Sequence, residues 1–82
     1  MQCYVYKSSR RADTYLYLAD RGGFGILPDA LRRTLGGLSL VLVLDLAQRS
    51  RLAQADIASV RAKLAHPGYY LQLPPSASLD GS

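Results

Sequence analysis

The chain has 82 residues and a formal net charge of +4, with 10 Lys and Arg against 6 Asp and Glu. Its composition is typical of a globular domain and excludes a chain that is disordered throughout. A domain of this size buries only a small core, so a deep enclosed active site is not expected. The positive charge permits phosphates or acidic proteins as partners, although a solvated basic surface is the simpler explanation.

The cellular compartment is indicated by three features. The single cysteine, Cys3, cannot form an internal disulfide. The first apolar run is too short for a signal peptide, because Lys7 interrupts it. The most apolar run, Leu38–Leu46, is about half as long as the roughly 20 residues of a membrane-spanning helix. We therefore expect a cytoplasmic protein without membrane contact.

The N-terminal part predicts a β-hairpin. Gln2–Lys7 and Thr14–Ala19 are rich in Tyr, Val and Leu at every second position, and a polar loop joins them. If the turn is centred on Arg10 and Arg11, the four tyrosines of the two strands share one face. They are Tyr4, Tyr6, Tyr15 and Tyr17. We expect a second layer to bury this face; an exposed face would instead be a platform for stacking nucleic-acid bases.

A helix and a third strand are predicted next. The helix contains Leu31 and Leu35 at helical spacing, begins near Pro28 and ends at Gly36. The strand, Leu38–Leu44, is apolar at nearly every position, a pattern typical of a strand covered on both faces. We expect this strand to be central in the sheet. Replacing Val41 or Leu42 by Asp is accordingly expected to unfold the domain.

The remaining elements are a second helix and a last strand. The helix is predicted from about Ala55 to Ala65, with Ile57, Val60 and Leu64 on one stripe. The last strand, Tyr69–Leu73, ends at two prolines. If both helices are crossover connections, the last three strands run parallel to one another. The folded domain is expected to span residues 1–75, with a flexible tail over 76–82.

The order of elements is strand, strand, helix, strand, helix, strand, and two groups of residues carry a family resemblance. The opening motif consists of Cys3, Tyr6, Ser8, Ser9, Arg11 and the run Thr14-Tyr15-Leu16-Tyr17. The closing motif consists of Ala55-Asp56-Ile57, Val60, Leu64 and the run Gly68-Tyr69-Tyr70-Leu71-Gln72-Leu73-Pro74-Pro75. Over residues 3–75 the chain resembles the YcgL domain family. The resemblance implies a bacterial cytoplasmic protein and brings no catalytic or binding residues with it.

The fold class predicted from these observations is α+β. The resemblance implies a compact α/β/α sandwich, and the pattern predicts a sheet of about four strands with one helix on each face. No separate linker or internal repeat is visible in the sequence.

Catalytic and metal-binding chemistry has few candidate residues. The chain has one His, one Cys and no Glu, and no pair of residues has the spacing of metal ligands. His66 follows a predicted helix, where a surface or capping role is expected. Cys3 lies in an apolar strand and is expected in the core. We expect no cofactor and no metal. The segment Gly22–Gly25 formally fits the G-x-x-G pattern of an RNA clamp, but a flexible turn is the preferred interpretation.

Two basic loops are the candidate binding sites. The first contains Ser8, Ser9, Arg10 and Arg11; the second contains Arg49, Ser50 and Arg51. Their hydroxyl and guanidinium groups suit phosphate or carboxylate oxygens. With parallel strands the two loops would lie at opposite ends of the sheet, and solvated loops remain the simpler interpretation.

The function is not determined by the sequence. A small non-enzymatic binding or adaptor module with a protein partner is the preferred hypothesis. Nucleic-acid binding through the basic loops and tyrosines is the alternative, and an enzyme is the hypothesis with the least support. Any anionic partner is expected to bind the first loop, because a loop held by two strands presents its donors rigidly.

Overall fold

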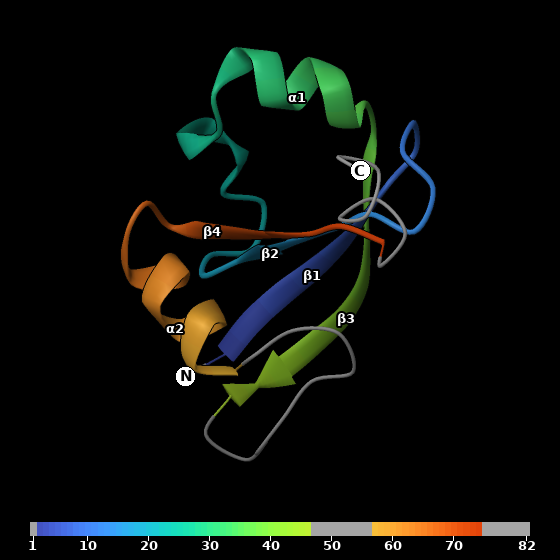
Figure 1. Cartoon of the computed structure of the whole chain (residues 1–82). Helices are drawn as coiled ribbons and strands as arrows, with labels where there is room; N and C mark the ends of the chain where they lie inside the picture. The colour runs from blue at the N-terminus through green and yellow to red at the C-terminus, as the bar shows by residue number, and fades with distance from the viewer. Residues whose placement is uncertain (1, 47–56, 75–82) are drawn as a thin grey trace, which may run out of the picture.

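A computed structural model describes residues 2–46 and 57–74 of the chain. These residues include a four-stranded sheet, two α-helices and the 3-10 turn η1 (Figure 1). In chain order the elements are β1 (Gln2–Ser8), β2 (Tyr15–Leu18), η1 (Phe24–Ile26), α1 (Asp29–Leu35), β3 (Leu38–Asp45), α2 (Ile57–Ala65) and β4 (Tyr69–Gln72). The α+β class and the predicted order of elements are confirmed.

The sheet has the strand order β3-β1-β2-β4, and every pairing in it is antiparallel. The expectation that β3 is central was therefore wrong, because β3 pairs only with β1 and forms an edge of the described sheet. The expectation that β2, β3 and β4 run parallel to one another was wrong as well. The strands β2 and β3, which α1 connects, run in the same direction, but β4 runs antiparallel to both. The hairpin strands β1 and β2 occupy the centre.

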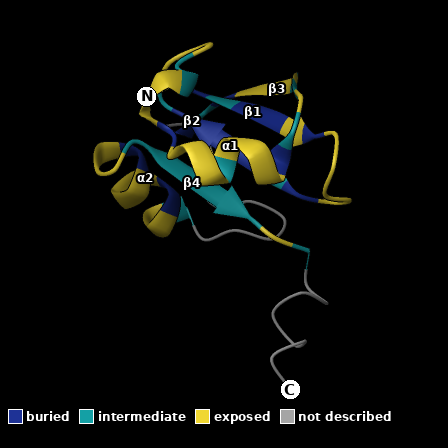
Figure 2. Cartoon of the chain, turned by 90° about the horizontal axis from the view of Figure 1, so that it is seen from above, coloured by how far each residue is buried: buried dark blue, intermediate teal, exposed yellow. Residues whose placement is uncertain are grey.

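The two helices lie on opposite faces of the sheet, as the sandwich prediction required (Figure 1). Each face has its own core. The core on the α1 side consists of Tyr6, Leu16, Leu18, Leu27 and Leu35. The core on the α2 side consists of Cys3, Val5, Tyr17, Leu44, Leu46, Val60 and Leu64. Figure 2 shows that β1 and β2 are largely buried between these layers, whereas the outer faces of the helices are exposed.

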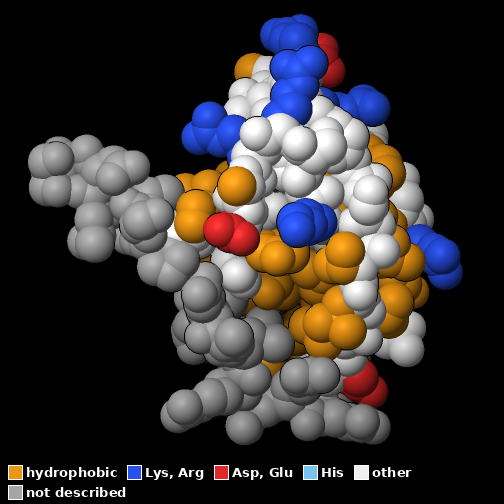
Figure 3. Space-filling view, turned by 90° about the vertical axis from the view of Figure 1, so that its right-hand side faces the viewer, with side chains coloured by type: hydrophobic (Ala, Val, Ile, Leu, Met, Phe, Trp, Pro, Cys, Tyr) orange, Lys and Arg blue, Asp and Glu red, His pale blue; other side chains and the backbone are white. Residues whose placement is uncertain are grey.

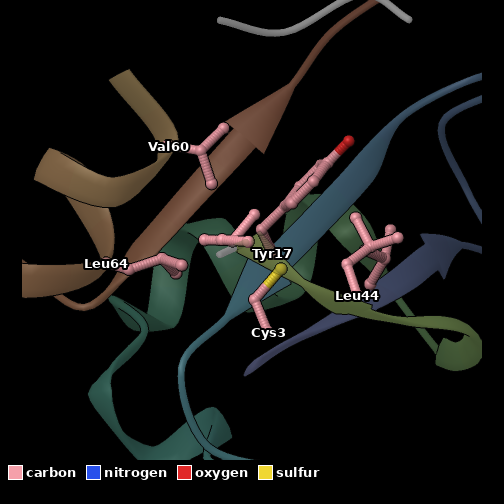
Figure 4. Packing of buried hydrophobic residues seen from close by; sticks show 7 residues of the cluster. Cys3, Tyr17, Leu44, Val60 and Leu64 are labelled. Carbon is pink, nitrogen blue, oxygen red and sulfur yellow. The ribbon is translucent and has the colours of Figure 1, made fainter. Parts of the chain in front are cut away.

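The α2-side core shows how the predicted stripe of the second helix is used. Val60 and Leu64 are both buried and point toward the sheet (Figure 4). Tyr17 lies between them and Cys3 in the same cluster. Its ring packs edge-to-face on Tyr70 at a centroid distance of 5.6 Å. The phenolic hydroxyl donates a 2.6 Å hydrogen bond to the Gln72 side chain, so the buried polar atom is satisfied.

The pairing of the hairpin differs by one residue from the prediction. Tyr4 pairs with Leu18, and Tyr6 pairs with Leu16. A shift of one residue moves a whole strand's side chains to the opposite face. Tyr4 and Tyr6 therefore face α1, whereas Tyr15 and Tyr17 face α2. The prediction of one shared tyrosine face was wrong.

The physical reason for this shift lies in the loop. Asp13 has a φ of 55°, a left-handed conformation that Asp tolerates better than most residues. The loop thereby gains one residue over the symmetric turn assumed from the sequence. The burial part of the prediction holds for Tyr6 and Tyr17, which are buried, whereas Tyr4 and Tyr15 are half-buried.

A β-bulge explains why β3 is apolar at both odd and even positions although it is not a central strand. Val5 pairs with Leu42 and Tyr6 pairs with Leu40, so Val41 is an extra residue on β3. Leu38 and Leu40 consequently pack with the α1-side core, whereas Leu44 belongs to the α2-side core. One strand thus supplies both layers, and the bulge changes which layer its side chains face.

Candidate binding site at the hairpin loop and strand β3

The hairpin loop predicted as a binding site is fixed to the end of α1. The Ser8 hydroxyl donates a 2.6 Å hydrogen bond to the Leu35 carbonyl and accepts hydrogen bonds from the backbone N–H groups of Arg10 and Arg11. Ser9 exchanges two hydrogen bonds with Gly37: its N–H donates to the carbonyl, and its hydroxyl accepts from the N–H. Ser8 and Ser9 therefore hold the loop in place, whereas the guanidinium groups of Arg10 and Arg11 make no hydrogen bond within residues 2–46 and 57–74.

Arg10 lies against the C-terminal end of α1. Its N–H donates to the Leu35 carbonyl at 3.4 Å. Its aliphatic stem passes over Gly36, where an added Cβ would lie 2.6 Å from the Arg10 Cγ. Gly36 also has a φ of 69°, which side chains rarely allow, so the glycine is required both for the turn and for this close approach.

This contact forms one wall of a pocket of about 500 Å³. The described residues that line it are Arg10, Phe24, Arg32, Arg33, Gly36 and Leu38, and the name "arginine pocket" is used for it below. Three arginines, one from the hairpin loop and two from α1, line it, and none of these lining residues is acidic. Arg32 and Arg33 also lie in the last turn of α1, where cations interact favourably with the helix dipole.

The other predicted binding residues are less constrained by the structure. Arg11 is exposed in the same loop but does not line the pocket. The second predicted loop, with Arg49, Ser50 and Arg51, lies outside the described residues. The end of β3 that precedes it pairs with Gln2, whereas the hairpin loop lies beside Leu38, at the other end of the strand.

The outer strand β3 presents an apolar surface next to these basic residues. Val41, Leu42 and Val43 are 51%, 46% and 43% exposed, and they are called the β3 strip below. Figure 3 shows hydrophobic side chains gathered in the middle of this side of the molecule, with Lys and Arg side chains above them. Lys7, on the neighbouring strand, is exposed and pairs with Ser39 of β3. Strip and basic residues therefore share one side of the domain.

The residues with catalytic potential lie apart from this surface. Cys3 is buried in the α2-side core, as predicted, and burial raises the pKa of its thiol. The pKa of Tyr17 is raised chiefly by burial and further by the neighbouring Cys3. His66 is exposed directly after α2. Among residues 2–46 and 57–74, no three His, Cys, Asp or Glu side chains gather as a metal site.

No helix in the described part of the chain is both long and apolar enough to cross a membrane.

Sequence reasoning identified Arg10 but missed Arg32 and Arg33. The two arginines follow each other at exposed positions of α1, where a solvated helix face is the ordinary interpretation. Only the docking of the hairpin loop on the end of α1 brings them to Arg10. The signal in the sequence is indirect: the pair Gly36-Gly37, directly after α1, permits that close approach.

Comparison with known proteins gives a consistent result. The family model of the YcgL domain matches residues 3–75. A YcgL domain-containing protein of Shewanella denitrificans is 49% identical over 75 residues, which cover 92% of this chain and 79% of the relative. One of Xanthomonas euvesicatoria is 49% identical over 81 residues, covering 99% of this chain and 94% of the relative. The names of these relatives state a domain and no activity. The match includes the hairpin strands β1 (from Cys3) and β2 and the last strand, β4. Because it covers most of the chain, the chain belongs to the YcgL domain family.

Proposed function

We propose that the domain is a non-enzymatic binding module in which the β3 strip docks a protein partner. The partner is an acidic chain that presents an extended apolar segment. The observation that carries this proposal is the exposure of Val41, Leu42 and Val43 on an edge strand of the described sheet. Apolar side chains in such a position are costly unless a partner covers them.

The bulge at Val41 makes this edge selective. Flat edges pair indiscriminately with other strands, whereas a bulge twists the edge and breaks the ladder. A partner must therefore match the local shape of β3 as well as its apolar character. Addition of an extended segment to a sheet edge is a recurring way in which small domains bind peptides, with side-chain contacts giving the specificity.

Charge favours a different protein over a second copy of this chain. Each copy carries a net charge of +4, and Lys7 lies one strand away from β3. Pairing two β3 edges would bring these like charges together, which opposes association. An acidic partner gains from the same charges and approaches faster at low salt. The Lys and Arg side chains above the hydrophobic patch in Figure 3 would contribute to that attraction.

The alternatives have less support from the geometry. Nucleic-acid stacking on a tyrosine platform would need the four rings on one exposed face, but they divide between the two faces, and Tyr6 and Tyr17 are buried. Catalysis would need reactive groups that converge, but Cys3 lies in the core and His66 lies on the surface after α2. The buried single thiol suits a reducing cytoplasm, where we place the protein.

The experiment compares two lysine substitutions in the tagged protein. Val41→Lys puts a charge in the strip, and Ala58→Lys puts the same charge on an exposed position of α2. Each protein is incubated with nuclease-treated lysate from its own cells, and captured proteins are identified by mass spectrometry. The candidate partner is then purified and titrated, and its contact is mapped by cross-linking. We expect an acidic protein that cross-links near residues 38–45, binds the Ala58→Lys variant like wild type, and loses at least about tenfold in affinity for Val41→Lys.

Three outcomes would overturn the proposal. Equal binding by both variants would remove the strip from the interface. Loss of capture after nuclease treatment would point to nucleic acid. A self-association that Val41→Lys abolishes, measured by sedimentation, would make a second copy the occupant of the strip.

A further inference from the structure

We propose that the arginine pocket is a separate site, which binds a small organic phosphate carrying an apolar ring. This inference is independent of the protein partner proposed for the β3 strip. It begins from three positive charges, on Arg10, Arg32 and Arg33, that line one pocket. Within residues 2–46 and 57–74, none of the three guanidinium groups has a carboxylate partner in an ion pair. Three positive charges around one pocket repel one another, whereas a bound anion attracts each of them.

The site is organised before any ligand binds. The hydrogen bonds of Ser8 and Ser9 to the end of α1 fix the backbone that carries Arg10. Arg32 and Arg33 lie within the last turn of the same helix. A ligand therefore does not have to order a loop in order to meet all three side chains. Because the backbone that carries the three arginines is already ordered, binding has to order only their side chains.

The number of donors favours phosphate over carboxylate. A phosphate monoester carries about −1.5 to −2 charges at neutral pH and three acceptor oxygens. Guanidinium groups match such oxygens with paired N–H donors. A carboxylate carries a single negative charge, so it compensates less of the positive charge of the three arginines. The phosphate is therefore the group that fits this arrangement.

The remaining lining favours an organic ligand over the free ion. Phe24 and Leu38 add an apolar wall to the pocket. The Phe24 ring is held edge-to-face against Tyr6 at a centroid distance of 4.9 Å, so its position is fixed by the core. The volume of about 500 Å³ lies within the range of about 300–1,000 Å³ seen for small-molecule sites. Inorganic phosphate alone would leave the apolar wall in water.

Calorimetric titration with three probes tests both parts of the ligand. Phenyl phosphate carries the ring and the anion, inorganic phosphate carries the anion alone, and phenol carries the ring alone. We expect phenyl phosphate to bind at least about fivefold more tightly than inorganic phosphate, because the ring buries apolar surface on Phe24 and Leu38. Phenol is expected not to bind measurably. Equal affinity for phenyl phosphate and inorganic phosphate, or no binding of phenyl phosphate at millimolar concentration, would overturn the proposal.

Two neighbouring arginines supply the matched variants. Arg10 lines the pocket and Arg11 does not. Arg10→Gln is expected to weaken phenyl phosphate binding about tenfold or more, and Arg11→Gln less than about twofold. Arg10→Lys keeps the aliphatic stem over Gly36 and the positive charge but loses the paired N–H donors of the guanidinium group. If this variant folds like wild type, its loss of affinity for phenyl phosphate is expected to lie between those of Arg11→Gln and Arg10→Gln. An equal loss of affinity in Arg10→Gln and Arg11→Gln would show that a diffuse basic surface, not the pocket, binds the anion. The same conclusion would follow if a short RNA bound more tightly than phenyl phosphate and depended equally on both arginines.

Discussion

The central hairpin and the outer strand β3 are both rich in apolar residues, but the structure uses them differently. Leu16, in the hairpin, is 0% exposed, whereas Leu42, in β3, is 46% exposed. Both are leucines in strands of the same sheet. The difference arises from strand order, because in the described sheet β1 and β2 have neighbours on both sides whereas β3 pairs only with β1. Apolar character therefore does not by itself report where in a sheet a strand lies.

The largest expected effect comes from truncating the same side chain in the two regions. Leu16→Ala leaves a cavity in the α1-side core and is expected to cost about 2–5 kcal/mol of unfolding free energy. Leu42→Ala removes the same atoms from a half-exposed position and is expected to cost about 1 kcal/mol or less. Urea unfolding followed by circular dichroism measures both. Similar losses in the two variants would show that the edge is as buried in solution as the centre.

A smaller effect is expected at alkaline pH, through the buried Cys3. Because burial raises the pKa of its thiol, the folded chain keeps a proton that the unfolded chain releases above about pH 9. The free energy of unfolding should then be unaffected by this group at neutral pH and should fall as the pH rises past 9. Tyr17, whose pKa is also raised, adds a further loss above about pH 10.

Urea unfolding between pH 7 and pH 10 in wild type and Cys3→Ala isolates the thiol. The variant is expected to have a lower stability at pH 7, owing to lost packing, and a shallower decline above pH 9. Parallel curves for the two proteins would mean that the thiol titrates alike in the folded and unfolded chains.

The smallest expected effect on the free energy of unfolding comes from a charge placed on the edge strand β3. Val41→Asp was expected from the sequence to unfold the domain, but Val41 is the bulge residue and is 51% exposed. The aspartate can stay in water, so the change in unfolding free energy is expected to be about 1 kcal/mol or less. The melting temperature of the variant, compared with that of Ala58→Asp on α2, measures it. Unfolding of Val41→Asp, but not of Ala58→Asp, would show that β3 is buried in the folded protein.

The elements of the fold could be predicted because their signals are local. Pro28 and Gly36 mark the limits of α1, and the stripe of Val60 and Leu64 identifies the buried face of α2. The pairing of the strands could not be predicted in the same way. It depends on one left-handed residue, Asp13, and on one extra residue, Val41, and neither leaves a clear trace in the periodicity.

In the candidate site, too, the local features could be predicted from the sequence, whereas the tertiary contacts could not. Arg10 was predicted because a short loop held by two strands presents its donors rigidly, but the serines beside it hold the loop rather than present donors to a ligand. Arg32 and Arg33 could not be assigned to the site, since their partner in the fold is more than twenty residues away in sequence. A contact between a loop and a helix end is a property of the tertiary structure.

The bulge in β3 makes the length of that strand more critical than its composition. Leu38 and Leu40 serve one layer and Leu44 serves the other only because Val41 is inserted between them. For the fold, the presence of a residue at position 41 matters more than its side chain: deleting Val41 would put the leucines before it out of phase with those after it. Natural variation in this strand should therefore proceed by exchange of residues, while gain or loss of a single residue is selected against.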